Sequence, residues 1–229
     1  MDDLLFKAAE AYKELMNYEY ILIGGTSKRK IIISILSSDA DKFTHVCGLD
    51  HLKDIPSVTA KKSREKEMIF KKILQKKISY DIIAKSKYFN QPLSTSSTGE
   101  VFNIKTRIEQ TVNIKNYFDN AYNGSFCKWN KKNSNGSIIR RTNIDADYLL
   151  AVPTLTQGIK MYLFFFQTNK EEKDKTAPIR LTLFSAFTDV DCLSVGQQSF
   201  CTILEEQCIN KCSGEKIVLY DRLKQPVLL

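Results

Sequence analysis

The stretch that decides the fold is KMYLFFFQTNKEEKDKTAPIRLTLFSAF, residues 160–187. Residues 160–168 and 179–187 are dominated by aromatic and aliphatic side chains, over lengths that suit strands. Between them, the charged sequence KEEKDK at residues 170–175 reads as a surface connection. The whole stretch therefore predicts a β-hairpin.

Further strands are predicted on both sides of this hairpin. They cover residues 126–130, 138–142, 147–152, 199–210 and 216–220, with a polar turn at 131–136. The hydrophobic period changes near Ser125, because apolar residues in the preceding part of the chain recur three and four positions apart. This spacing predicts helices at residues 2–16, 63–77, 79–88 and 107–120.

The first half of the chain also contains two segments that read as strands. Residues 18–23 and 30–36 predict a hairpin with its turn at residues 24–27, which begin with Gly24 and Gly25. Helices nevertheless lead and an antiparallel sheet follows. We therefore predict an α+β fold with N-terminal helices packed on a C-terminal antiparallel sheet.

The length of 229 residues is sufficient for one sizeable core, and no long linker interrupts the chain. We predict a single domain over residues 1–229, helix-rich in 1–124 and strand-rich in 125–229. The Ser- and Thr-rich segment at 91–99 reads as a surface loop. With 43% hydrophobic and 26% charged residues and no long apolar run, we expect a soluble protein without a membrane partner.

Six cysteines occur without any C-x-x-C pair: Cys47, Cys127, Cys192, Cys201, Cys208 and Cys212. The paired spacing of structural zinc modules is missing, and the start of the chain lacks the features of a secretion signal. We therefore expect free, mostly buried thiols, no metal site and no cofactor.

The net charge of the chain is +8, and the excess of basic residues is concentrated in two segments, residues 50–90 and 125–142. Basic side chains interleaved with aromatic residues suit a phosphate backbone and its bases, which makes a nucleic acid the expected partner. A solvated, lysine-rich surface is the alternative interpretation. The predicted nucleic-acid-binding residues are Lys61, Lys62, Lys71, Lys72, Lys128, Trp129, Lys131, Lys132, Arg140 and Arg141.

Both histidines of the chain, His45 and His51, lie in the segment FTHVCGLDHLKDIP at residues 43–56. Histidine titrates nearest neutrality and is therefore the default candidate for a general acid or base. A short helix is expected from about residue 39, with His45 near its end and Gly48 as its stop signal. The alternatives are a helix-end His45 bonded to the backbone and a loop histidine without a role at position 51.

Several segments occur in an order that resembles one known family. They are AYKELMNYEY at 11–20, HVCGLDHLKDIP at 45–56, EMIFKKILQKKISYDIIAKSKYF at 67–89, Arg107-Ile108, DADYLL at 145–150, YLFF at 162–165, and Gly196-Gln197 before TIL at 202–204. The ordered set resembles the phage-encoded Barnase–EndoU–Colicin–RelE-like nucleases, fourth subfamily, over nearly the whole chain.

The resemblance implies a ribonuclease that needs no metal, in a phage or prophage setting and hence in the cytoplasm of the host bacterium. It marks His45 as the family's first histidine. Members often carry a histidine where this chain has Asp50, and here the histidine follows at His51. Recurring polar positions of the family are matched by Arg64, Arg107, Tyr148 and Gln197.

Metal-free cleavage of RNA requires a base for the ribose 2′-OH, an acid for the leaving 5′-oxygen and a cation for the phosphorane. His45 and His51 are the candidate base and acid, and Arg64 or Arg107 is the candidate phosphate clamp. Tyr148 completes the candidate catalytic set. A structural salt bridge is the alternative for Arg107, and strand packing is the alternative for Tyr148.

A second class of function fits the same residues. A phage protein that has lost its active site would retain the basic face, and would bind a nucleic acid or a host defence complex without cleaving it.

Overall fold

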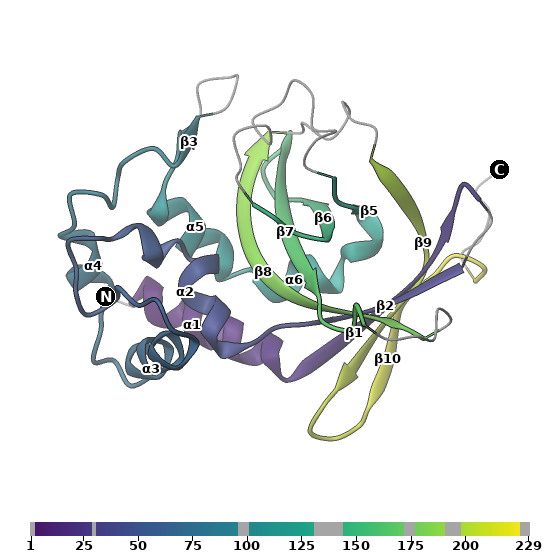
Figure 1. Cartoon of the computed structure of the whole chain (residues 1–229), viewed down its shortest axis with the longest axis horizontal. Coiled ribbons are helices and arrows are strands. Elements are labelled where there is room, and N and C mark those ends of the chain that lie inside the picture. The colour runs from purple at the N-terminus through teal and green to yellow at the C-terminus, as the bar shows by residue number, and fades with distance from the viewer. Residues whose placement is uncertain are drawn as a thin grey trace.

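The computed structural model describes residues 3–28, 31–95, 101–130, 144–171, 177–190 and 198–224. Most helices gather on one side of the molecule, at the left in Figure 1, and long curved strands form the other side. The α-helices are α1 (Leu4–Met16), α2 (Phe43–Val46), α3 (Ser63–Leu74), α4 (Tyr80–Ala84), α5 (Ile104–Thr111) and α6 (Ile114–Asp119). Three short 3-10 helices are η1 (Ala40–Lys42), η2 (Leu49–His51) and η3 (Ala121–Asn123).

The main sheet has eight strands in the order β1-β2-β8-β7-β6-β5-β9-β10. Its strands are β1 (Tyr18–Thr26), β2 (Ile31–Ser37), β5 (Ser125–Lys128), β6 (Tyr148–Pro153), β7 (Ile159–Gln167), β8 (Ile179–Val190), β9 (Ser199–Asn210) and β10 (Lys216–Asp221). A small separate hairpin is formed by β3 (Ser94–Thr95) and β4 (Val101–Phe102). The predicted strand at 138–142 and the predicted turn at 131–136 lie outside the described residues.

Strand β9 closes the sheet on itself. It pairs with β1 along one side, from Cys201 to Asn210. On its other side it pairs first with β5 and further along with β10. Because β9 joins β1 to β5, all the strands of the main sheet except β10 form a closed ring.

The predicted arrangement of helices on a C-terminal antiparallel sheet is therefore only partly correct. The fold mixes helices and strands, but β1 and β2 come from the first part of the chain. In addition, β2 pairs with β8 in parallel, with Ser34 opposite Ile179. A parallel pair needs a long connection, and here all the helices from α2 to α6 lie between the two strands.

The predicted hairpin at 160–187 is confirmed as β7 and β8, and it contains one irregularity. Phe164 faces Ser185 while the next residue, Phe165, faces Leu183. Phe184 is therefore an extra residue in β8 with no partner in β7, which is a β-bulge.

The predicted hairpin of residues 18–23 and 30–36 is confirmed as β1 and β2, but its turn begins at Ser27 and not at Gly24. Strand β1 continues through both glycines to Thr26. A Cβ on Gly24 would overlap the Sγ of Cys201 and would lie 3.1 Å from the carbonyl oxygen of Thr202. The glycine is thus required by the close approach of β1 to β9, where the register of this pair also shifts.

The apolar face of α1 forms the centre of the helical side. Tyr12 is fully buried, and its ring centroid lies 5.4 Å from that of Phe43 and 5.9 Å from that of Phe70. Asp3 caps this helix by accepting the backbone N–H of Phe6 at 3.0 Å, and it also accepts that of Tyr80 at 3.0 Å. The same apolar cluster continues into one face of the sheet, so helices and strands share it.

The helices that carry the histidine segment and Arg107 pack on β8. Helix α2 contacts both α3 and β8, and α5 contacts both α1 and β8. The predicted helix at 107–120 is divided into α5 and α6 at Asn113, whose backbone leaves helical geometry at φ −100° and ψ 13°. The predicted helix at 79–88 is shorter, since α4 ends at Ala84.

In the described part of the chain, no helix combines the length and the apolar character needed to cross a membrane.

Candidate active site at the histidine segment

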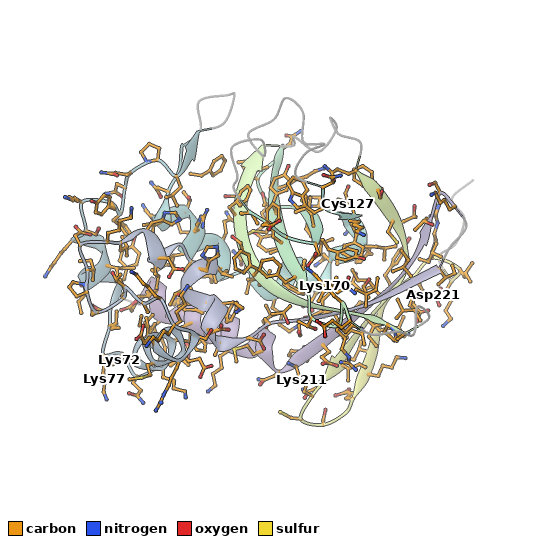
Figure 2. All side chains as sticks on the ribbon, in the orientation of Figure 1. Lys72, Lys77, Cys127, Lys170, Lys211 and Asp221 are labelled. Atoms are coloured by element: carbon orange, nitrogen blue, oxygen red, sulfur yellow. The ribbon has the colours of Figure 1, made fainter. Side chains whose placement is uncertain are left out.

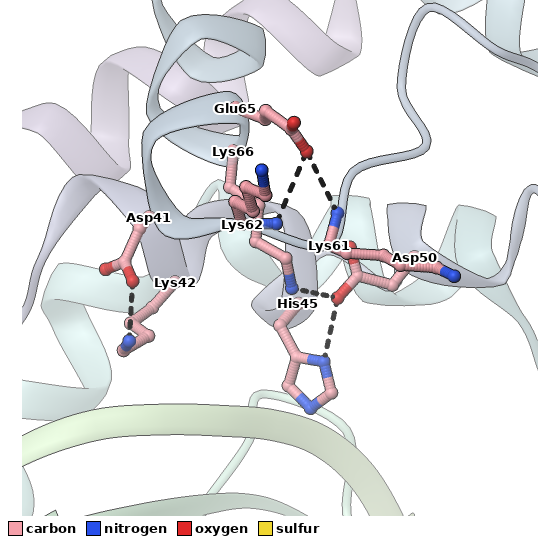
Figure 3. Close-up of polar contacts among 8 residues, drawn as sticks. All are labelled: Asp41, Lys42, His45, Asp50, Lys61, Lys62, Glu65 and Lys66. Atoms are coloured by element: carbon pink, nitrogen blue, oxygen red, sulfur yellow. Dashed lines mark hydrogen bonds and ion pairs between the residues drawn. The ribbon is translucent and has the colours of Figure 1, made fainter.

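A tight turn folds the histidine segment back on itself. Helix α2 ends at Val46, and Gly48 follows in the left-handed conformation with φ 75°, as expected of a helix stop. The 3-10 helix η2 then brings Asp50 back towards α2. As a result, the Nδ1 atom of His45 lies 3.1 Å from the Oδ2 atom of Asp50 (Figure 3).

Lys66 of α3 contacts the same carboxylate oxygen. Its Nζ donates to the Oδ2 of Asp50 at 2.7 Å, so Asp50 links His45 to α3. Burial opposes ionisation of Asp50, but the hydrogen bonds from His45 and Lys66 outweigh it and lower the pKa of Asp50 to about 2. Asp50 is therefore a carboxylate at neutral pH.

The pairing with Asp50 determines which nitrogen of His45 is available. A carboxylate beside Nδ1 favours a proton on that nitrogen. The other ring nitrogen, Nε2, points away from Asp50 (Figure 3). The His45 side chain is 28% exposed, so this nitrogen belongs to a side chain that solvent and a substrate can reach.

Arg107 reaches the histidine segment from α5. Its Cδ and Nη1 atoms would lie 3.0 Å and 3.6 Å from a Cβ on Gly48, so the missing side chain leaves room for the arginine. The guanidinium Cζ lies 5.9 Å from the ring centroid of Phe187. Burial lowers the pKa of Arg107 to about 10.

In the described part of the chain, no carboxylate neutralises this partly buried guanidinium. Among the described residues, the Arg107 side chain makes no ion pair, so the structural salt bridge considered for it is not found there. A desolvated cation without an anionic partner is costly in a folded protein.

His51 lies within the field of the same charges. The pKa of His51 is lowered, first by the protein atoms around its ring and then by the positive charges of Arg107 and His45. The Asp50 carboxylate opposes this shift. The His51 residue remains exposed, so solvent screening limits the effect, but its direction favours the neutral imidazole.

A pair of phenylalanines on the sheet contacts His45 through one of its rings. The Phe184 ring centroid lies 4.8 Å from that of His45, and the Phe166 ring centroid lies 4.4 Å from that of Phe184. Both residues are partly exposed. The site is thus walled by helices on one side and by aromatic rings of β7 and β8 on the other.

The other predicted catalytic residues lie elsewhere. Arg64 is an exposed residue in the first turn of α3, and the cation that reaches Asp50 is Lys66 instead. Tyr148 is 7% exposed and its ring stacks on Phe126, with centroids 5.6 Å apart. It belongs to the apolar cluster shared with the helices, and no described contact links it to the histidines.

The predicted nucleic-acid-binding residues are divided among several environments. Trp129 is 6% exposed and packs edge-on against Phe164, so its ring is covered. The backbone N–H groups of Lys61 and Lys62 donate to Glu65 at 3.3 Å (Figure 3). The exposed lysines are Lys61, Lys62, Lys71, Lys72 and Lys128, whereas Lys131, Lys132, Arg140 and Arg141 lie outside the described residues.

The sequence interpretation missed Lys66 and Phe184, and it gave Asp50 no role of its own. The nearest signal was the spacing of Asp50 five positions after His45 across a helix-stopping glycine. A turn of that kind brings both side chains to one end of the helix. No local pattern marks Lys66 or Phe184, because each reaches the site from another element.

The cysteines of the described part have free thiols, namely Cys47, Cys127, Cys201, Cys208 and Cys212. Within the same part of the chain, no group of three or more His, Cys, Asp or Glu side chains is arranged to hold a metal ion.

Comparison with known proteins identifies a matching family. The profile of the family described as phage-Barnase-EndoU-ColicinE5/D-RelE like nuclease4 matches residues 4–222, which is nearly the whole chain. No curated protein and no solved structure is similar enough to match. The chain belongs to the phage-Barnase-EndoU-ColicinE5/D-RelE like nuclease4 family.

Proposed function

We propose that this nuclease-like protein is a ribonuclease that cleaves RNA with the acid–base chemistry of its own side chains. The observation that carries the proposal is the position of Arg107, a partly buried guanidinium without a carboxylate partner in the described structure, against Gly48 of the histidine segment and within the electrostatic reach of His51. Two imidazole side chains and one cation without a carboxylate partner are the parts that metal-free phosphodiester cleavage requires.

The two histidines are suited to different steps. His51, whose environment favours the neutral ring, would accept the proton of the ribose 2′-OH. The 2′-oxygen then attacks phosphorus and the bond to the 5′-oxygen breaks, which forms a 2′,3′-cyclic phosphate. His45, with Nδ1 held by Asp50, would deliver a proton from Nε2 to the leaving 5′-oxygen.

Arg107 would stabilise the charge that develops on the phosphorane. A guanidinium presents a planar set of donors that matches phosphate oxygens, and low exposure to water strengthens this interaction. The cation lies beside the proposed base, so one phosphate group would contact both.

The test is cleavage of RNA in the presence of EDTA. We expect wild-type protein to release fragments ending in a 2′,3′-cyclic phosphate, and to leave a 2′-deoxy oligonucleotide intact. His45→Ala and His51→Ala should each reduce the rate by about 10²- to 10⁴-fold. Arg107→Gln should reduce it by about 10²- to 10³-fold, whereas Arg222→Gln, at an exposed arginine, should have little effect.

A modified substrate separates the two histidine roles. In a 5′-bridging phosphorothiolate RNA the leaving sulfur needs no proton. We expect this substrate to restore cleavage by His45→Ala but not by His51→Ala. If the double variant His45→Ala, His51→Ala cleaves RNA like the wild type, the proposal is wrong; RNA binding without cleavage by the wild type would instead favour the non-catalytic binding function.

A further inference from the structure

The β-bulge in β8 directs one aromatic side chain towards the proposed active site. Phe184 is the extra residue of the bulge, since Phe164 faces Ser185 and Phe165 faces Leu183. Bulges redirect side chains and occur frequently beside active sites. Here the redirected ring lies against His45, with centroids 4.8 Å apart and planes inclined by 36°.

Phe184 and Phe166 form a pair that stands apart from the protein core. Their centroids lie 4.4 Å apart, and each residue is partly exposed. In the described part of the chain, neither residue belongs to either of the two apolar clusters or to the residues packed against them. The pair thus lies outside the two apolar clusters, and part of its surface remains accessible to solvent.

Other aromatic residues of this region are less available. Trp129 is 6% exposed and Phe187 is 5% exposed, and both belong to the second apolar cluster. Phe184 is thus the accessible aromatic residue in contact with a histidine of the site.

We propose that Phe184, supported by Phe166, is a platform on which an unpaired nucleobase stacks beside the scissile phosphate, so that the substrate is single-stranded RNA. This inference rests on the proposed function. Bases in a duplex are already covered on both faces, whereas an unpaired base can place one face on an aromatic ring. Because every base has such a face, the platform would accept all four bases.

The test measures binding without cleavage. The probe is a single-stranded 2′-O-methyl oligonucleotide, which lacks the nucleophilic 2′-OH, and binding is followed by fluorescence anisotropy. We expect Phe184→Leu to weaken binding by about 5- to 100-fold and Phe184→Trp to retain it. Phe6→Leu, which changes a partly exposed phenylalanine of α1, is the matched control and should bind like the wild type.

An abasic oligonucleotide of the same length separates stacking from an indirect effect. The wild type should bind the abasic probe more weakly than the base-containing probe. Phe184→Leu should then cause no further loss of affinity for the abasic probe. If Phe184→Leu weakens binding of both probes by the same factor, Phe184 only supports the structure of the site, and the inference is wrong. Equal affinity of the wild type for a single strand and for a duplex would also overturn it.

The two proposals can fail separately. If the protein binds the single-stranded probe through Phe184 but cleaves no RNA, the proposed function is wrong and the platform stands. If RNA is cleaved with dependence on both histidines while Phe184→Leu binds like the wild type, the platform is wrong and the proposed function stands. Thermal unfolding of each variant verifies that the leucine substitution leaves the fold intact.

Discussion

Asp50 is the residue that joins the histidine segment to α3. Its Oδ2 accepts from His45 Nδ1 at 3.1 Å and from Lys66 Nζ at 2.7 Å. Its Oδ1 is buried and has no partner in the described structure. All the hydrogen bonds of this carboxylate thus converge on one oxygen, which fixes the ring of His45 in one orientation.

We expect Asp50→Asn to change the tautomer of His45 and to reduce RNA cleavage by about 10- to 100-fold. The amide cannot hold the proton on Nδ1 as a carboxylate does. The tautomer is measured by ¹⁵N NMR of the imidazole nitrogens, and cleavage by kcat/KM on RNA. Asp81→Asn, at an exposed aspartate of α4, should alter neither quantity. An unchanged His45 tautomer in Asp50→Asn would contradict this role whatever the activity.

Glu206 of β9 is a buried carboxyl group whose ionisation should affect stability. Its Oε2 accepts the backbone N–H of Tyr122 at 2.7 Å, whereas its Oε1 is buried without a described partner. Burial raises the pKa of Glu206 to about 7, against the lowering effect of the backbone N–H groups of Tyr122 and Ala121. The folded protein therefore retains a proton that the unfolded chain has already lost at the same pH.

The sign of the pH dependence follows from this raised pKa. The stability linked to protonated Glu206 is fully present below the pKa of the unfolded chain, and it is lost as the pH rises towards about 7. We expect the unfolding free energy of the wild type, relative to Glu206→Gln, to fall by about 3 kcal/mol between pH 4 and pH 8. Urea unfolding at several pH values measures the difference. Glu10→Gln, at an exposed glutamate of α1, is the control. The difference in unfolding free energy between the wild type and this variant should stay constant over the same pH range.

At the scale of elements, α3 has one buried face and one lysine-rich face. Ile69, Phe70 and Ile73 are buried, while Lys71 and Lys72 are exposed. Lys72 and Lys77 lie at the helical end of the molecule, whereas Lys211 lies at the hairpin of β9 and β10 (Figure 2). The lysine-rich face is therefore available to a nucleic acid.

We expect the double variant Lys71→Gln, Lys72→Gln to weaken binding of single-stranded RNA and to reduce its salt dependence. Each lost phosphate contact removes about 0.7 from the slope of log affinity against log salt, or about 1.4 for both. Lys211→Gln with Lys216→Gln removes the same charge from the β9–β10 hairpin and should leave the slope unchanged. If the slope of log affinity against log salt is the same in the two double variants, the lysines of α3 make no special phosphate contacts and form only a solvated surface.

At the scale of the whole molecule, the seam between β1 and β9 closes the sheet. Gly24 lies at this seam, where an added Cβ would overlap the Sγ of Cys201. A Cβ on the neighbouring Gly25 would lie 3.6 Å from the Cδ1 of Leu204, which is an ordinary contact. Two adjacent glycines of one strand therefore differ in their tolerance of a side chain.

We expect Gly24→Ala to destabilise the protein by about 1 to 3 kcal/mol, because the methyl group overpacks the seam. Gly25→Ala should be close to neutral, and Cys201→Ala should partly relieve the cost of Gly24→Ala by removing the overlapping sulfur. Urea unfolding of the single and double variants tests this. Equal stabilities of Gly24→Ala and Gly25→Ala would contradict the assigned close approach.

The sequence by itself determined the elements with a strong local pattern. Strand β9 has the predicted bounds, and α1, β7 and α3 begin or end within a few residues of their predictions. Their apolar residues repeat with the period of the element, and this repeat depends only on which face is buried. Gly48 was predicted as a helix stop for an equally local reason, and the ordered family segments are matched by the family profile over residues 4–222.

Only the tertiary structure decided how these elements meet. The parallel pairing of β2 with β8, the closure through β9 and the burial of Trp129 depend on residues far apart in the chain. The site depends on the same kind of contact, since Lys66, Arg107 and Phe184 reach the histidine segment from α3, α5 and β8. Local periodicity reports which face of an element is buried, but it carries no information about the partner that covers that face.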